Sequence, residues 1–169
     1  MIMRHRDGMD HTRDHVPDSS GQPVNARVVV GIDGSDTSWD AFCWACGETR
    51  RLGGRTVAVF VGPTSGAASA TAASLAGAGV AYGAIQQSMT DQAEELSDQV
   101  RAYGHDHGFD VAFVHTQGDT ARELLRIANA DHADLLVVGR STMALHHLAG
   151  SLGRRLVGTR GAPIIVVVP

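Results

Sequence analysis

Residues 28–35 read Val28-Val29-Val30-Gly31-Ile32-Asp33-Gly34-Ser35, and this stretch decides the fold. A short continuous apolar run is typical of a strand buried on both faces, and the Asp-Gly-Ser-Asp sequence that follows predicts a turn and then a helix N-terminus. Apolar residues continue at helical spacing from Trp39 to Cys46, and Gly53 and Gly54 end that pattern. A buried strand that leads directly into a helix indicates a parallel sheet with helices on its faces.

The same alternation of strand and helix continues to the end of the chain. Further strands are predicted at Thr56–Val61, Asp110–His115, Leu135–Val138 and Ile164–Val168, and further helices at Ala84–Tyr103, from Asp119 or Thr120, and from Ser151. We therefore predict the α/β class, with an open doubly wound five-stranded parallel sheet. Ligands of such sheets bind beyond the carboxyl ends of the strands, which places Asp33, Val61, Thr116 and Gly139 where a ligand would lie.

The length of 169 residues indicates one domain with an extension. Residues 1–26 are charged and lack a periodic apolar pattern, so we predict a disordered tail followed by a domain over residues 27–169. Residues 62–83 are mostly Gly, Ala, Ser and Thr, and we predict a loop there.

The charged residues exclude several function classes. All 14 basic residues are arginines, so neither a lysine-dependent phosphate loop nor Schiff-base chemistry is available. The net charge of -4, without a basic cluster, argues against a nucleic-acid partner. The apolar runs are too short to span a membrane, and a cytoplasmic protein is expected.

Five motifs in this order resemble the universal stress protein family. They are residues 28–35 with Ser38 and Ala41, Gln117–Asp119, Ala133–Gly139, Gly150–Ser151 and Ala162–Val167. The resemblance covers nearly all of residues 27–169 and implies strand order 3-2-1-4-5, a homodimer and a role in stress response. In one branch of the family it also implies an adenine nucleotide at the ends of the first and fourth strands.

That branch carries Gly-x-x-Gly, nine residues, then Gly-Ser or Gly-Thr, and the match here is partial. Gly139 and Gly150-Ser151 are present, but Thr142 replaces the second glycine and the following loop is two residues short. By resemblance, the ligand would be ATP or another adenine nucleotide, with or without Mg²⁺. Its site would comprise Gly31, Asp33, Val61, Val138, Gly139, Gly150, Ser151 and Leu152, with Arg140 and Arg154 as counter-charges.

Structural interpretations of these residues stay open. Gly139 also suits a strand end, Gly150-Ser151 a helix cap, and Asp33 a turn. Cys43 and Cys46 form a C-x-x-C, but they lie inside a helix, so buried structural thiols are expected rather than a redox or metal site. Histidine pairs occur at 11 and 15, 105 and 107, and 146 and 147, and solvated side chains without a metal are expected.

The sequence therefore favours a stress-response regulatory protein whose partner binding is tuned by an adenine nucleotide. The alternatives are a stress protein that works by interaction alone, or a weak nucleotide hydrolase that uses Asp33 and Arg140; an enzyme is the less favoured outcome. Ile164–Val168 lacks charge and would form a sheet edge, which predicts a homodimer through this strand. The competing interpretation is a monomer whose edge is protected by Pro163 and Pro169.

Overall fold

The fold is built on a five-stranded, all-parallel sheet of order β3-β2-β1-β4-β5. The computed structural model describes residues 25–64, 78–140, 152–157, 159 and 161–169, with the backbone alone for 78–86. The strands are β1 (Ala26–Gly31), β2 (Gly54–Gly62), β3 (Val111–Gln117), β4 (Leu135–Gly139) and β5 (Ile164–Val168), and the helices are α1 (Asp36–Leu52), α3 (Ala78–His107), α4 (Thr120–Ala130) and α5 (Leu152–Val157). The predicted fold class and strand order are confirmed.

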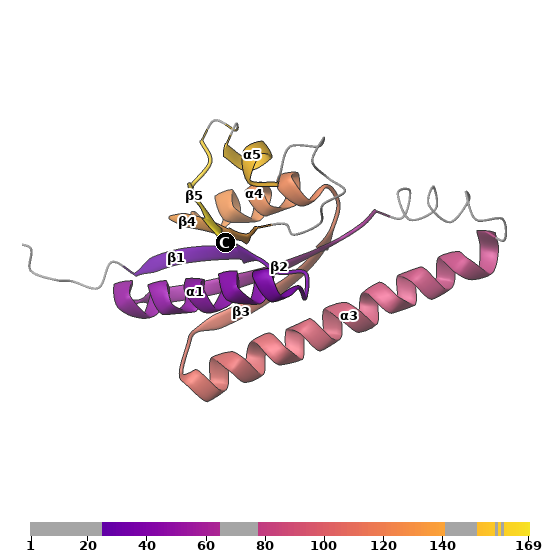
Figure 1. The fold of residues 1–169 in the computed structure, drawn as a ribbon, viewed down its shortest axis with the longest axis horizontal. Coiled ribbons are helices and arrows are strands. Elements are labelled where there is room, and N and C mark those ends of the chain that lie inside the picture. Colours follow the sequence, from indigo (N-terminus) through magenta and orange to yellow (C-terminus); the bar gives the residue numbers. More distant parts are fainter. Residues whose placement is uncertain (1–24, 65–77, 141–151, 158, 160) are drawn as a thin grey trace, which may run out of the picture.

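The helices lie on the two faces of the sheet, as the strand order requires (Figure 1). From β1 to β3 the chain moves outward in one direction, and from β3 to β5 it moves back across the sheet. Right-handed crossovers then put α1 and α3 on one face and α4 and α5 on the other. The direction reverses between β1 and β4, so the switch point of the sheet lies there.

The central strand β1 supplies side chains to both faces. Val28 and Val30 pack with α1 and α3, whereas Val29 packs with α4 and α5, and all three are fully buried. Phe42 is the largest fully buried side chain under α1, and Leu124 is its counterpart under α4. Burial of a side chain of this size stabilises the fold by about 1.5–3 kcal/mol, so these two cores carry much of its stability.

The helix boundaries differ from the sequence expectations mainly at α3. This helix begins at Ala78 and ends at His107, so residues 78–83, which were predicted to belong to a loop, are helical; the rest of the predicted loop from residue 65 to 77 lies outside the described residues. Alanine favours helix strongly enough to extend it through glycines that would otherwise signal a loop. The domain also starts earlier than predicted, because Ala26 is a buried residue of β1 and donates its N–H to Gly53.

The two cysteines are not equivalent. Cys46 is buried as expected, and burial raises the pKa of its thiol to about 11. Cys43 is exposed, which contradicts the expectation of two buried thiols. The reason is the spacing: positions three apart on a helix near the edge of its apolar stripe need not both face the core. Among the described residues, no helix is long and apolar enough to cross a bilayer.

Two glycines near the start of the sheet provide a matched test of packing. A Cβ on Gly54 would overlap the carbonyl oxygen of Ala26 and lie 2.7 Å from its nitrogen, whereas one on Gly47, inside α1, would meet nothing within 4 Å. We expect Gly54→Ala to lower the free energy of unfolding by about 1–3 kcal/mol, since β1 must shift. Gly47→Ala should raise it by about 0.5–1 kcal/mol through helix propensity. Urea denaturation measures both, and an unaffected Gly54→Ala would disprove the close approach of β1 and β2.

Candidate functional site

The carboxyl ends of β1, β4 and β2 meet at the switch point of the sheet. Val30 lies beside Val137, so the next residues, Gly31 and Val138, are neighbours on adjacent strands. On the other side Gly31 pairs with Val59, which puts Val61 at the level of Asp33. The structure therefore brings the predicted positions together at the carboxyl ends of the strands. They are Gly31, Asp33, Val61, Val138 and Gly139.

Asp33 is held in a turn that links β1 to α1. Its Oδ1 accepts hydrogen bonds from the backbone N–H of Ser35 at 3.0 Å and from the Ser35 hydroxyl at 2.6 Å. Burial by itself would raise the pKa of Asp33, but the hydrogen bonds from Ser35 and Ser38 outweigh it and hold the pKa below its ordinary value. The carboxylate is thus ionised at neutral pH and its direction is fixed, while the residue stays exposed.

Ser35 also caps α1. Its hydroxyl accepts from the N–H of Ser38, and the Ser38 hydroxyl donates to the Ser35 carbonyl at 2.8 Å. Gly34, between the turn and the cap, has a φ of +87°, where other residues are strained. The sequence Asp-Gly-Ser is therefore required by the turn itself, and the structural interpretation of Asp33 accounts for its local contacts.

Gly139 brings β4 against the first turn of α1. A Cβ at this position would overlap the carbonyl oxygen of Thr37, lie 2.6 Å from its carbonyl carbon and lie 3.0 Å from the nitrogen of Ser38. Only glycine permits this backbone contact. Gly139 is consequently needed for packing whether or not a ligand binds, and it leaves the end of β4 without a side chain at the switch point.

The other predicted positions can offer mainly backbone to a ligand. Val138 is 2% exposed, and Val61 and Leu152 pack against the core beneath α4 and α5. A Cβ on Gly31 would lie 3.2 Å from Leu124, so this glycine fits the side chain of α4. Gly150 and Ser151 lie outside the described residues, as do Thr142 and the histidines at 11, 15, 146 and 147.

Gln92 is a residue of this site that sequence reasoning missed. Its side chain extends from α3 and donates from Nε2 to the carbonyl oxygen of Asp33 at 3.3 Å. A Cβ on Gly34 would lie 3.7 Å from both Gln92 and Leu96, so α3 packs directly against the turn. No local pattern could reveal this contact, because the two residues are 59 positions apart.

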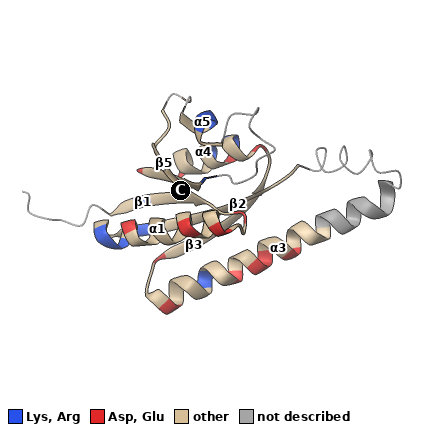
Figure 2. Ribbon diagram, in the orientation of Figure 1, with Lys and Arg blue, Asp and Glu red and all other residues tan. Residues whose placement is uncertain are grey.

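The surface near the switch point carries more acidic than basic side chains. Figure 2 shows acidic residues at the start of α1 and along α3, and these include the exposed Asp36, Asp40, Asp91, Glu94 and Glu95. The predicted counter-charges Arg140 and Arg154 are also exposed. Within the described ranges, no group of three or more His, Cys, Asp and Glu side chains is arranged to hold a metal ion.

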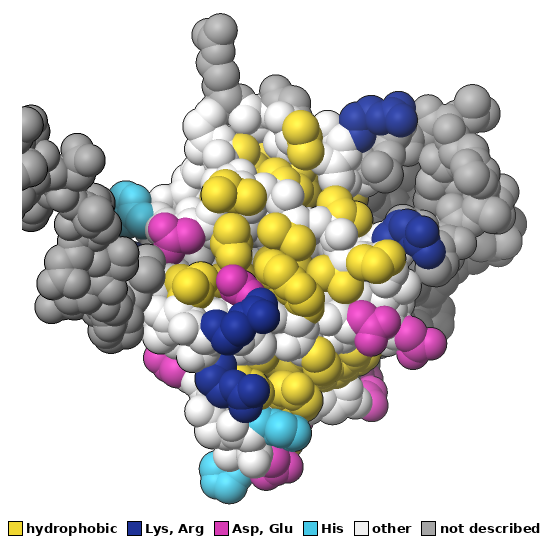
Figure 3. Space-filling model, turned by 60° about the vertical axis from the view of Figure 1, so that its left-hand side comes forward, with side chains coloured by type: hydrophobic (Ala, Val, Ile, Leu, Met, Phe, Trp, Pro, Cys, Tyr) yellow, Lys and Arg dark blue, Asp and Glu magenta, His cyan; other side chains and the backbone are white. Residues whose placement is uncertain are grey.

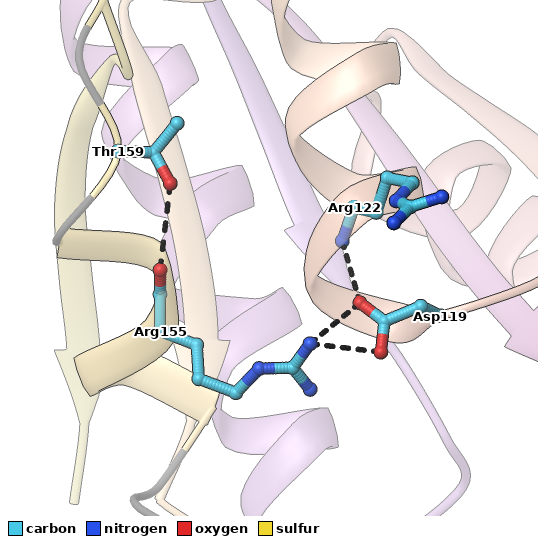
Figure 4. A network of polar contacts seen from close by, with 4 residues as sticks. All are labelled: Asp119, Arg122, Arg155 and Thr159. Atoms are coloured by element: carbon cyan, nitrogen blue, oxygen red, sulfur yellow. Dashed lines mark hydrogen bonds and ion pairs between the residues drawn. The ribbon is translucent and has the colours of Figure 1, made fainter.

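A second polar network joins α5 to the N-terminus of α4 (Figure 4). Asp119, one of the two residues predicted to begin this helix, is the N-cap residue of α4 and accepts from the N–H of Arg122 at 3.1 Å. Both of its carboxylate oxygens also accept from Arg155, each at 2.8 Å. Arg155 and the N–H of Arg122 together hold the pKa of Asp119 below its usual value. Arg155 therefore ties α5 to the N-terminus of α4.

The remaining candidates have structural partners. Thr116 donates its hydroxyl to Glu123 at 3.0 Å. His105 contacts Asp106, and His107 contacts the carbonyl of Tyr103 in the last turns of α3, where positive charge is favoured. Both histidines are exposed, as expected, and the ring of His107 also stacks with those of Tyr103 and Phe109.

The comparisons with known proteins agree on one family. A family model described as the universal stress protein family matches residues 25–168. A universal stress protein of Methanocaldococcus jannaschii is 23% identical over 150 residues, which is 88% of this chain and 85% of that protein.

Solved structures share the fold at low identity. A universal stress protein in complex with cAMP superimposes with a TM-score of 0.60 at 22% identity, covering 86% of this chain and 97% of that one. One from Archaeoglobus fulgidus in complex with dAMP gives a TM-score of 0.59 at 15% identity, covering 86% and 99%. At these identities the likeness shows the fold alone.

The two roles of Asp119 can be separated by substitution. Asn caps helices about as well as Asp but cannot form the ion pair, so Asp119→Asn should lower the free energy of unfolding by less than about 1 kcal/mol, as is usual for an exposed pair. Asp119→Ala loses the cap as well and should lower the free energy of unfolding by about 1 kcal/mol more. Folding lowers the pKa of Asp119. The contribution of the ion pair to the free energy of unfolding is therefore complete above the unfolded pKa of about 3.9, and it is lost as the pH falls through the lower pKa of the folded state. Denaturation at pH 7 and at pH 3 measures this, and a wild-type advantage over Asp119→Asn that does not shrink in acid would contradict the ion pair.

Proposed function

The chain belongs to the universal stress protein family, and from this we propose that it is a cytoplasmic stress-response regulator that binds an adenine nucleotide at the carboxyl ends of β1 and β4. The observation that carries the proposal is the switch point, where Gly31, Asp33, Val61, Val138 and Gly139 come together. Ligands of doubly wound sheets bind at this place. Two proteins of the same fold have been solved with cAMP and with dAMP, which supports an adenine ligand.

The contacts indicate how each group would take part. Asp33 offers an ionised, fixed carboxylate to ribose hydroxyls, which are good hydrogen-bond donors. Val61 offers backbone N–H and C=O to the base, since its side chain packs in the core. Gly139 leaves the nucleoside free access to the end of β4, and Gly150, Ser151 and Leu152 would meet the phosphates.

The charge distribution bears on which nucleotide binds best. Asp33 and Asp36 are exposed at the site, and Arg140 and Arg154 are the cations that we assign to the phosphates. A triphosphate would bring more negative charge next to these carboxylates than a monophosphate or a cyclic nucleotide does. Mg²⁺ would offset that charge, so ATP binding should depend on it more than AMP or cAMP binding does.

Calorimetric titration tests the proposal. ATP with and without Mg²⁺, AMP and cAMP are titrated into wild type, Gly150→Val and Asp33→Asn. Gly150→Val should remove phosphate-dependent affinity because a side chain blocks the backbone approach. Asp33→Asn should weaken every nucleotide about tenfold or more, the usual loss for a hydrogen bond to a charged group. Asp110→Asn, an exposed change directly before β3 at the amino ends of the strands, is the matched control and should leave affinity unchanged.

The alternatives make different predictions in the same experiment. A stress protein that works by interaction alone would show no heat with any nucleotide, and this result would refute the proposed site. A weak hydrolase would bind ATP and also release phosphate in an Asp33-dependent manner. We expect binding without turnover.

We also propose that the protein is a homodimer through β5, on the edge of the sheet. Ile164 is 69% exposed and Val167 is 48% exposed, an unusual exposure for large apolar side chains. β5 lies on the side of the molecule that Figure 3 brings forward, where hydrophobic side chains are gathered in one area. A second copy would pair the free backbone of this edge and bury these side chains.

The orientation of the strand selects the variant that tests the dimer. Val166 packs toward the core under α1, so a charge at Val166 would disturb folding, whereas Val167 is exposed. Val167→Asp should dissociate the dimer without unfolding it, and Val157→Asp, an equally apolar and exposed position on α5, should not. Light scattering on wild type should give twice the 17.8 kDa of one chain. A monomer mass at micromolar concentrations would exclude the dimer.

A further inference from the structure

β3 forms the other edge of the sheet, and its outer side has free backbone groups. Thr56 donates its N–H to the carbonyl of Asp110, and Gly118 donates to the carbonyl of Gly62. In a parallel ladder each residue directs its N–H and its C=O to the same neighbouring strand, and successive residues alternate between the two sides. The even-numbered residues of β3 therefore bond to β2. The odd-numbered residues Val111, Phe113, His115 and Gln117 therefore present N–H and C=O away from the sheet.

Nothing in β3 protects this edge. The strand is seven residues long, contains no proline or lysine, and none of its residues is buried. Natural proteins usually blunt such an edge with charge, proline or a covering element. Among the described residues β3 pairs with β2 alone, so the free backbone groups are available to another strand.

A groove runs beside the same edge on the face that carries α4. It has a volume of about 420 Å³ and lies between α4 and the outer two strands. Its apolar floor includes Val57, Ala112, Val114 and Ile127, and Arg55 and Arg126 stand at its sides. Alternate side chains of a strand added to β3 would point to this face, where the floor would receive small apolar groups.

Arg55, Arg126 and Asp131 are the charged residues that line the groove, and the two arginines are its most exposed charges. Arg55 pairs with Asp131 and Arg126 with Glu123, but the guanidinium side chains are 45% and 57% exposed whereas the two carboxylate side chains are only 16% and 15% exposed. Within the part of the chain that the structure describes, Arg126 donates to Glu123 from Nε and Nη2, and Arg55 donates to Asp131 from Nη2. The remaining guanidinium N–H groups can bind a carboxylate from outside.

We propose that β3 and this groove bind an extended segment of another protein by strand addition, and that the side chains of this segment that face the groove, every second one along the strand, are small apolar or acidic. The free N–H and C=O groups of the odd-numbered residues give main-chain hydrogen bonds, the groove floor selects the apolar side chains, and Arg55 and Arg126 select the acidic ones. This surface is on the opposite edge of the sheet from β5 and does not involve the nucleotide site, so it is independent of the function proposed above.

The geometry favours an extended segment over a helix or a compact ligand. A helix satisfies its own backbone and would leave the outer groups of β3 unpaired. A small molecule would fill the groove but would not use the edge. Only an extended chain engages both features together, because its backbone lies along β3 while alternate side chains enter the groove.

The test uses a seven-residue probe, the length of β3, in which every second residue is valine or glutamate in turn and the residues between them are serine, acetylated and amidated at its ends. Fluorescence anisotropy of the labelled probe with the full chain should show saturable binding that weakens with salt, and the same probe with lysine in place of glutamate should bind at least about tenfold more weakly. Amide hydrogen exchange gives a signature of strand addition. The probe should slow exchange at Val111, Phe113, His115 and Gln117, and should leave the already bonded amides of Ala112, Val114 and Thr116 unchanged.

Two pairs of variants separate backbone from charge. His115→Pro removes one outward N–H and keeps the ladder with β2, so it should weaken the probe by about fivefold or more, whereas His115→Ala should change affinity by less than about twofold. Arg126→Glu should lower the affinity for the probe about tenfold or more. Arg122 is an exposed arginine of the same helix outside the groove, and Arg122→Glu should lower the affinity by less than about twofold. Thermal melts check that each variant is folded.

Three outcomes would overturn the proposal. One is the absence of saturable binding up to about 1 mM probe, the weak limit of specific recognition. Another is protection spread over β5 or the switch point instead of the alternate residues of β3. The third is protection of the same four amides that rises with protein concentration before any probe is added, which would identify the occupant as a second copy of this chain.

Discussion

The burial of β1 on both faces is the constraint on which the rest of the structure depends. Val28 and Val30 belong to one core and Val29 to the other, and all three are fully excluded from water. A strand with this property must be central, with β2 on one side and β4 on the other. The switch point then follows, since the chain can reach both neighbours with right-handed crossovers only by reversing direction beside β1. The position of the candidate site is thus a consequence of how the core is filled.

The switch point is built largely from backbone contacts. Gly139 lies against Thr37, the side chain of Asp33 holds the backbone of Ser35, and Gln92 holds the carbonyl of Asp33. These contacts join β4, α1 and α3 at one place, although the residues come from distant parts of the sequence. A site made in this way is fixed before a ligand arrives, which lowers the entropy that binding must overcome. It also means that the glycines and Asp33 have structural roles alongside the proposed binding role.

The two edges of the sheet differ in what they offer. β5 exposes large apolar side chains such as Ile164 and Val167, and burial of these side chains would drive the proposed association of two identical chains. β3 has a mixed character, with a small apolar floor beside it and exposed arginines at the rim. A self-complementary apolar edge suits a symmetric dimer, whereas a charged edge suits a different partner with complementary side chains. The nucleotide proposed at the switch point would lie between these two surfaces.

The sequence by itself determined the features that depend on neighbouring residues. The valine runs indicated the strands, the start of α4 was predicted at Asp119 or Thr120, and the motifs from residue 28 to 167 indicated the family and, through it, the strand order. It failed where local signals conflict, as in the alanine-rich start of α3, or where exposure depends on what covers a helix, as at Cys43. Only the tertiary structure decided the contacts of Gln92 with Asp33 and of Arg155 with Asp119, and the groove beside β3. Those features join residues far apart in the chain, and their geometry is set by the register and packing of whole elements, to which no short stretch of sequence corresponds.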